Sequence, residues 1–311
     1  MSYFNILSFD GGGIRGLLSC KLLERLDRLY PGYLEKVSLF AGTSTGGILA
    51  LGLAAGLTPS EIAELYQKDG VKIFSKNIWD KIGDIDRFYY ADYSNTTLEE
   101  ALRKKFGDMR LGDLKKKVLI SSFRLDSGSV TKMGVRSWKP KFFQNFEDDP
   151  SDSDQKVVDV ALRTSAAPTY FPVYQGFADG GLVANNPSMC AVAQALDKKT
   201  GKQKLNRITV LSIGTGVQPK FVTGFNENWG FLQWAPHLIT IMMDGVSGVA
   251  DFQCRQVLGP RYLRLDVLFQ RDIGLDNVDE IPYLVELADL EDISDTRKFF
   301  SKYYADNPPK K

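Results

Sequence analysis

The sequence contains only one histidine among 311 residues, and this scarcity restricts its chemistry more than any other feature. Histidine is the usual general base of enzymes and the commonest metal ligand. A site that holds a metal through several histidines is therefore excluded, and we expect no metal site. A Ser-His-Asp triad would have to use His237, because the chain offers no other imidazole.

Cysteine is scarce as well: Cys20, Cys190 and Cys254 are far apart and odd in number. This pattern provides neither a disulfide framework nor a zinc-binding cluster, and it is typical of a reducing compartment. The apolar segment 48–55 is far shorter than the roughly 20 residues that cross a bilayer. The N-terminal apolar run lacks a basic leader and a cleavage site, so we expect a cytoplasmic protein.

A dominant charge is also missing, because 39 basic and 38 acidic residues leave a formal net charge of +1. No global field attracts nucleic acid, and we expect neither DNA nor RNA as a partner. Hydrophobic residues make up 43% of the chain and charged residues 25%, which is typical of a globular protein and excludes disorder. We expect one domain over residues 1–311, with a frayed tail at 306–311.

Strand-like apolar runs alternate with helical patterns along the chain. The runs lie at 4–9, 37–41, 118–123 and 208–213, and the helical patterns lie at 18–29, 48–55, 156–165 and 187–196. A further helix begins at Thr58, which forms a capping box with Glu61. The alternation predicts an α/β fold, a three-layer α/β/α sandwich around a mostly parallel sheet. The less regular segments 72–94, 137–146 and 147–154 are expected to be insertions or surface elaborations.

The first motif with chemical content is Asp-Gly-Gly-Gly-Ile-Arg-Gly at 10–16, between a predicted strand and a predicted helix. Backbone N–H groups at the start of a helix can bind an anion. The same residues match the G-x-G-x-x-G fingerprint of dinucleotide-binding proteins, which needs an acidic residue at the end of the next strand. That strand ends instead in Ala-Gly-Thr-Ser at 41–44, which argues against a nucleotide-dependent oxidoreductase.

Two further motifs supply a nucleophile and an acid. Gly-Thr-Ser-Thr-Gly at 42–46 is a G-x-S-x-G elbow, which projects the Ser44 hydroxyl from the end of a strand. Alternatively, these residues only cap a helix. Asp179 lies in an Asp-Gly-Gly turn at 179–181, where it could accept the proton of Ser44 directly. A lone Asp-Gly pair is more often an ordinary turn, so the motifs carry weight only together.

In this order, the three motifs resemble those of the patatin-like phospholipase family. The resemblance spans about residues 5–216 and includes the segment 164–172, just before the aspartate. Beyond the glycines of the first loop, the matching motif glycines are Gly16, Gly42, Gly46, Gly180 and Gly181.

The resemblance implies a lipid acyl hydrolase of the phospholipase A type, a carboxylic ester hydrolase that acts peripherally on phospholipid membranes without a cofactor. It implies that Ser44 is the nucleophile and Asp179 the general base of a Ser-Asp dyad, with Arg15 supporting the glycine loop. It also implies an oxyanion hole formed by the backbone N–H groups of Gly11, Gly12 and Gly13. A dyad of this kind agrees with the scarcity of histidine.

Some bacterial members of the family stay inactive until a cyclic oligonucleotide binds, and then degrade the cell's membrane during phage infection. The resemblance therefore implies a cyclic di- or oligonucleotide activator and a role in antiviral defence. No motif of the sequence identifies a nucleotide pocket. An oligomeric assembly is left open.

Two alternatives to a dyad enzyme remain at this point. Ser44, Asp179 and His237 follow the chain order of an α/β-hydrolase triad, although His237 lies at an expected helix start, where a capping or partly buried histidine is common. The chain could also be a lipid-binding module without catalysis. The aromatic segment 221–234 suits either an interfacial lid or an acyl-chain wall, or else consists of ordinary core aromatics.

Overall fold

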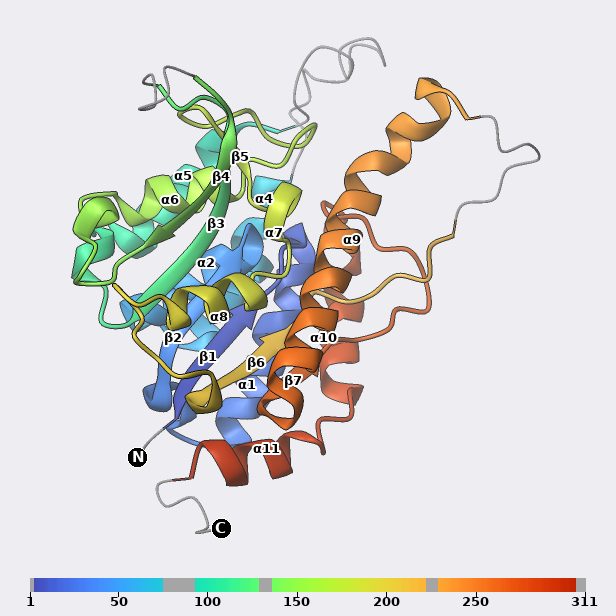
Figure 1. The fold of residues 1–311 in the computed structure, drawn as a ribbon. Helices are drawn as coiled ribbons and strands as arrows, with labels where there is room; N and C mark the ends of the chain where they lie inside the picture. The colour runs from blue at the N-terminus through green and yellow to red at the C-terminus, as the bar shows by residue number, and fades with distance from the viewer. Residues whose placement is uncertain (1–2, 75–92, 129–135, 222–228, 306–311) are drawn as a thin grey trace.

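The computed structural model describes residues 3–74, 93–128, 136–221 and 229–305. These residues form a seven-stranded sheet with the strand order β4-β3-β2-β1-β6-β7, and β5 pairs with β3 (Figure 1). The strands are β1 (Phe4–Phe9), β2 (Val37–Thr43), β3 (Lys117–Arg124), β4 (Lys139–Gln144), β5 (Phe177–Asp179), β6 (Ile208–Ile213) and β7 (Tyr262–Leu265).

The sheet is mostly parallel, as the alternation of strands and helices predicts. β3, β2, β1, β6 and β7 run in one direction, whereas β4 and β5 pair antiparallel with β3. The expectation of an irregular insertion at 137–146 is wrong, because β4 continues the sheet there. The predictions for the tail 306–311 and for most of the segment 72–94 concern residues outside the described ones.

Helices cover both faces of the sheet. In the described part of the chain they are α1 (Gly16–Leu29), α2 (Thr45–Ala55), α3 (Pro59–Glu64), α4 (Gly70–Ile73), α5 (Asn95–Phe106), α6 (Val157–Thr164), α7 (Gly181–Ala184), α8 (Ser188–Leu196), α9 (Phe231–Leu258), α10 (Ile281–Leu290) and α11 (Thr296–Tyr303). Figure 1 shows α8 and α9 in front of the sheet and α1 and α10 behind it. The result is the expected three-layer α/β/α arrangement.

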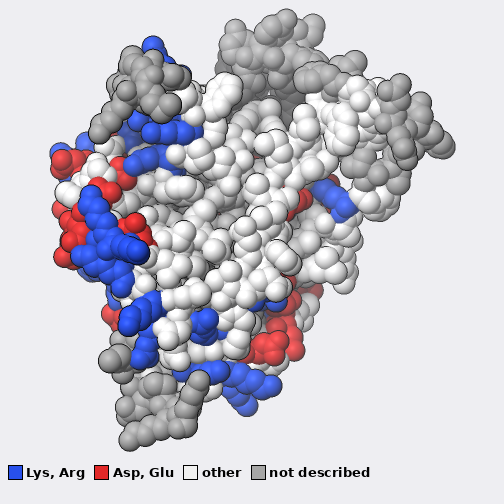
Figure 2. All heavy atoms as spheres, in the orientation of Figure 1, with Lys and Arg blue, Asp and Glu red and all other residues white. Residues whose placement is uncertain are grey.

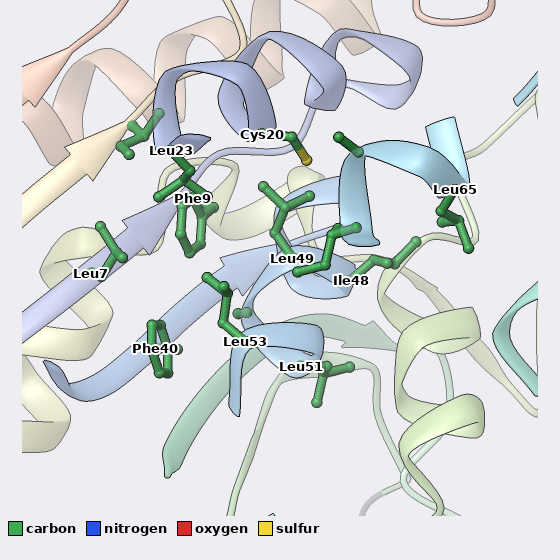
Figure 3. Close-up of a cluster of buried hydrophobic side chains, with 14 of the residues drawn as sticks. Leu7, Phe9, Cys20, Leu23, Phe40, Ile48, Leu49, Leu51, Leu53 and Leu65 are labelled. Atoms are coloured by element: carbon green, nitrogen blue, oxygen red, sulfur yellow. The ribbon is translucent and has the colours of Figure 1, made fainter. Parts of the chain in front are cut away.

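Two hydrophobic cores follow from the alternation of side chains along the strands. In β6, Leu211 and Ile213 point into the larger core, which also contains residues of α1, α2, α6 and α10. Ile208 and Val210 point into the smaller core, beneath α8 and the C-terminal part of α9. Figure 3 shows part of the larger core, where Phe9 and the side chains of α1 and α2 lie together.

The topology brings the chemical motifs to one edge of the sheet. β1 and β2 are parallel neighbours, so the loop after β1 and Ser44 after β2 lie at the same end. On β3, Ser121 pairs with Thr43 of β2, and the next residue, Ser122, pairs with Asp179 of β5. β4 pairs with the opposite edge of β3. β5 therefore pairs with the same edge of β3 as β2 does, directly beyond the end of β2. Asp179 is therefore placed beside the end of β2.

Candidate active site

Ser44 occupies a tight elbow between β2 and α2. Its φ of 53° and ψ of −124° lie in a region that non-glycine residues rarely adopt. Its N–H donates to Thr164 Oγ1 at 2.8 Å, and the Thr164 hydroxyl donates to the Ser121 carbonyl at 2.6 Å. A Cβ on Gly42 would collide with the carbonyl of Gly46, so the turn requires glycine there. Long-range hydrogen bonds thus hold the elbow in a strained conformation.

Asp179 is only 2% exposed and lines the same cavity as Ser44. Its Oδ1 accepts the Gly181 N–H at 2.6 Å, whereas its Oδ2 is buried and accepts no hydrogen bond in the described part of the chain. Burial raises the pKa of Asp179 to about 6, and the neighbouring Ser44 hydroxyl and Gly181 N–H oppose this rise. The carboxylate is thus close to the serine, and Oδ2 is available to accept a proton.

The glycine loop differs from the expectation at its first residue. The Gly11 N–H donates to the Asn185 carbonyl at 3.1 Å, so it is already used within the fold. Gly12 and Gly13 line the cavity of Ser44, and their N–H groups make no hydrogen bond to the other residues that the structure describes. The candidate oxyanion donors are therefore Gly12 and Gly13, without Gly11.

Two residues orient the peptides of this loop: Thr215, which is distant in the sequence, and Arg15 at the end of the loop. The Thr215 hydroxyl donates to the Gly11 carbonyl at 2.8 Å, and Arg15 donates to the Gly12 carbonyl through its N–H at 3.1 Å and its Nε at 3.3 Å. In a trans peptide the carbonyl and the following N–H point in opposite directions. Thr215 therefore directs the Gly12 N–H, and Arg15 directs the Gly13 N–H. Arg15 thus supports the glycine loop by holding the Gly12 carbonyl, in line with the expectation of a supporting role. The sequence analysis assigns no role to Thr215.

A buried ion cluster anchors the first residue of the loop. The Arg264 guanidinium donates to both carboxylate oxygens of Asp10, at 2.8 and 2.6 Å, and to Asp266 at 2.6 Å. Asp266 in turn accepts the Gly216 N–H at 2.9 Å. These bonds join the end of β1 to β7 and to the turn that carries Thr215. Sequence reasoning missed Arg264, because no motif surrounds it.

Mostly apolar side chains line the rest of the cavity. They come from segments far apart in the sequence and include Ile48, Leu65, Ile73, Phe74, Leu98 and Leu275. Met243 of α9 also lines the cavity and lies near Gly181. Besides Ser44 and Asp179, the lining residues with polar side chains are Thr45, Tyr66, Ser165 and Tyr170. A lining of this kind suits a hydrocarbon chain whose polar end lies at the serine.

The histidine of the alternative triad lies elsewhere. His237 is exposed on α9, its ring centre is 6.0 Å from that of Trp229, and it does not line the cavity of Ser44 and Asp179. The structure therefore gives the triad no support. In the aromatic segment, Phe221 and Trp234 are exposed, which contradicts the core alternative for these two; residues 222–228 lie outside the described chain.

Neither a metal site nor a membrane span was found in the part of the chain that the structure describes. No group of three or more His, Cys, Asp or Glu residues there is arranged to hold a metal ion. None of the helices there, including the 28-residue α9, combines the length and the apolar character needed to cross a membrane.

The fold and the elbow define an α/β protein with a strand–serine–helix turn beside a buried aspartate. The family model of patatin-like phospholipases matches residues 7–192, and the chain belongs to this family. Membership implies lipid hydrolase activity.

Three curated relatives are similar to the chain over most of its length. The putative sporulation hydrolase CotR of Bacillus subtilis is 30% identical over 97% of this chain and 98% of its own. The protein teg of Priestia megaterium is 36% identical over 75% of this chain and 69% of its own. A cGAMP-activated phospholipase of Pseudomonas aeruginosa is 32% identical over 85% of this chain and 78% of its own.

Proposed function

We propose that the protein is a phospholipase of the A type that releases fatty acids from membrane phospholipids with a Ser44–Asp179 dyad. The observation that carries this proposal is the shared cavity, in which the buried Oδ2 of Asp179 has no hydrogen-bond partner among the described residues. The apolar lining of that cavity supports a long-chain acyl substrate. The exposed position of His237 supports a dyad rather than a triad.

In the first step, the Ser44 hydroxyl attacks the ester carbonyl while its proton moves to Asp179 Oδ2. Negative charge then develops on the carbonyl oxygen. The N–H groups of Gly12 and Gly13 are the donors for this oxyanion, and each such donor typically contributes about 3 kcal/mol to lowering the barrier. The Thr45 N–H, which directly follows the nucleophile at the start of α2, is a third candidate donor.

In the second step, the tetrahedral intermediate collapses and the C–O bond to the glycerol breaks. Asp179 gives its proton to the leaving alkoxide, so a lysophospholipid departs and an acyl ester remains on Ser44. Water then attacks this ester while Asp179 takes up a proton. When the intermediate collapses, that proton returns to the Ser44 oxygen, and the fatty acid is released.

The outer side of α9 supports action at a membrane surface. Apolar side chains are exposed there at helical spacing, namely Trp234, Leu238, Ile241, Met242, Val249 and Phe252. Figure 2 shows few charged side chains on the face that carries α8 and α9. Because Met243 of the same helix lines the catalytic cavity, a lipid surface against α9 would lie near the site. We infer a cytoplasmic enzyme that acts peripherally on membranes.

A cyclic dinucleotide activator is part of the proposal, because three relatives are named cGAMP-activated phospholipases. Such an activator would fit a role in antiviral defence, where membrane damage must await a signal. Fatty-acid release from phospholipid vesicles, measured with and without cGAMP, tests this part. Equal rates in the two conditions would remove cGAMP from the proposal and leave the hydrolase intact.

A fluorophosphonate probe tests the catalytic part, because it labels only an activated serine. We expect the wild type to be labelled and to release fatty acid, and we expect Ser44→Ala to lose both properties. Ser127→Ala, at a buried serine outside the cavity, is the matched control and keeps the label. A wild type that binds lipid vesicles but stays unlabelled, with or without cGAMP, would favour the lipid-binding module instead.

A further inference from the structure

A second, polar cavity continues from the catalytic one. It has a volume of about 240 Å³ and shares Tyr170, Met243 and Leu275 with the cavity of Ser44. Its charged lining residues are Arg15, Lys220 and Asp244. A third cavity, of about 490 Å³, is also lined by these three charged residues and extends the polar space toward Asp251 and Arg255. The polar space begins where the apolar space ends, as the two parts of a phospholipid would require.

Most charges of this polar space are already paired. Arg264 binds Asp10 and Asp266, Arg255 binds Asp251 at 2.8 Å, and Lys220 binds Asp272 at 3.1 Å. Arg15 and Asp244 are different: they attract one another electrostatically, but they lie too far apart for a salt bridge. A positive and a negative group therefore face the same cavity with space between them.

Each of the two groups retains hydrogen-bonding capacity. Arg15 uses its Nε on the Gly12 carbonyl, and its terminal N–H groups bind no other described residue. The carboxylate of Asp244 accepts no hydrogen bond within the described chain. A guanidinium with several N–H groups suits a phosphate, and a carboxylate suits an ammonium group.

The position of Arg15 also fits the geometry of a lipid. It touches the same peptide whose N–H, that of Gly13, is a proposed oxyanion donor. In a glycerophospholipid, only a few covalent bonds separate the ester carbonyl from the phosphorus. A phosphate beside Arg15 would thus leave the ester carbonyl within reach of Ser44, and the rest of the headgroup would extend toward Asp244.

We infer that this polar cavity binds a zwitterionic headgroup, with the phosphate beside Arg15 and the ammonium beside Asp244. The inference rests on the proposed phospholipase function and deepens it, because it names the substrate class. An anionic glycerol headgroup would place no positive charge beside Asp244. The enzyme therefore prefers phosphatidylethanolamine to phosphatidylglycerol.

The test uses the full chain, with any cyclic dinucleotide that its activity requires. It compares phosphatidylethanolamine with phosphatidylglycerol, carrying the same acyl chains, in micelles of a nonionic detergent. Each rate is divided by the rate on p-nitrophenyl butyrate, which has no headgroup, so an effect on the serine itself cancels. We expect Asp244→Asn to lower the ethanolamine-to-glycerol ratio about tenfold and Asp244→Lys to reverse the preference. Asp289→Asn, at an exposed aspartate on α10, is the matched control and keeps the wild-type ratio.

An Asp244→Asn ratio within twofold of the wild type, or a wild type that prefers phosphatidylglycerol, would overturn the inference. A second measurement needs no variant: glycerophosphoethanolamine should inhibit hydrolysis of p-nitrophenyl butyrate by the wild type more strongly than glycerophosphoglycerol. Equal inhibition would also overturn it. A wild type that hydrolyses neither lipid would contradict the proposed phospholipase function instead, so the two failures differ.

Discussion

The floor of the catalytic cavity and its α9 wall are built in different ways. The floor consists of Gly12, Gly13, Ser44 and Asp179. Hydrogen bonds from the distant residues Thr164 and Thr215 and from the nearby Arg15 hold its backbone. The wall is one long helix that reaches the site through Met243, while many of its outward apolar side chains are exposed. Hydrogen bonds therefore hold the reacting groups in place, whereas the wall presents an apolar surface to the outside. Substitutions in the floor should therefore cost much more activity than substitutions on α9.

The largest effect is expected for the base in the floor. Asp179→Asn should lower kcat/KM about 10²- to 10⁴-fold, because an amide cannot accept the serine proton. For the wild type, burial raises the pKa of Asp179 to about 6, so kcat/KM should fall as the pH drops below about 6. A pH profile of ester hydrolysis measures both effects. A variant with near wild-type activity would show that another group acts as base.

The same burial predicts a gain in stability from this substitution. Because the folded pKa of Asp179 is raised, its stabilising contribution is present below the unfolded pKa and is lost as the pH rises through about 6. Between pH 4 and pH 8, the wild type should lose about 2 kcal/mol of unfolding free energy relative to Asp179→Asn, since one pKa unit is worth about 1.4 kcal/mol and pH 4 already lies slightly above the unfolded pKa of 3.8. Urea unfolding at the two pH values measures this difference, and a constant difference would contradict it.

A smaller effect is expected for a support of the floor. Thr215→Val keeps the side-chain shape but removes the hydroxyl that holds the Gly11 carbonyl, so the Gly12 N–H is less well directed. We expect kcat to fall about tenfold with little change in KM, because an oxyanion donor acts in the transition state. Thr215→Ser keeps the hydroxyl and should restore most of kcat. Equal losses in both variants would assign Thr215 a packing role only.

The smallest effect is expected on the wall. His237→Ala should keep ester hydrolysis within about twofold of the wild type, because His237 is exposed and does not line the cavity of Ser44. Initial rates on a soluble ester measure this. If His237→Ala were as inactive as Ser44→Ala, the triad would be correct and the contrast between floor and wall would fail.

Much of the fold is predictable from the sequence, because a regular spacing of apolar residues indicates which segments form strands and helices. The predicted strand at 208–213 matches β6 residue for residue, and the capping box of Thr58 and Glu61 forms as expected. β4 was missed because its first residues are Lys139, Pro140 and Lys141, which are poor strand formers. An edge strand tolerates such residues, since one side of its backbone has no strand partner.

The sequence also predicted which parts of the site would meet. Three short motifs, through the family that they resemble, pair Ser44 with Asp179, and both residues line one cavity. It could not reveal that Gly11 has already used its N–H, nor that Thr215 and Arg264 support the loop. These facts depend on hydrogen bonds between residues that are 174, 204 and 254 positions apart, and no local pattern encodes them.

The local chemistry follows from the sequence alone: a strained serine turn, a glycine loop and an aspartate turn each depend on the conformations that their own residues allow. The tertiary structure decided how these pieces face each other. β5 pairs with the same edge of β3 as β2 does, directly beyond the end of β2. The register of β5 on β3 therefore places Asp179 beside Ser44. The approach of α9 and β7 then decided which charges face the open cavity, because ion pairing and burial depend on neighbours that only the folded chain provides.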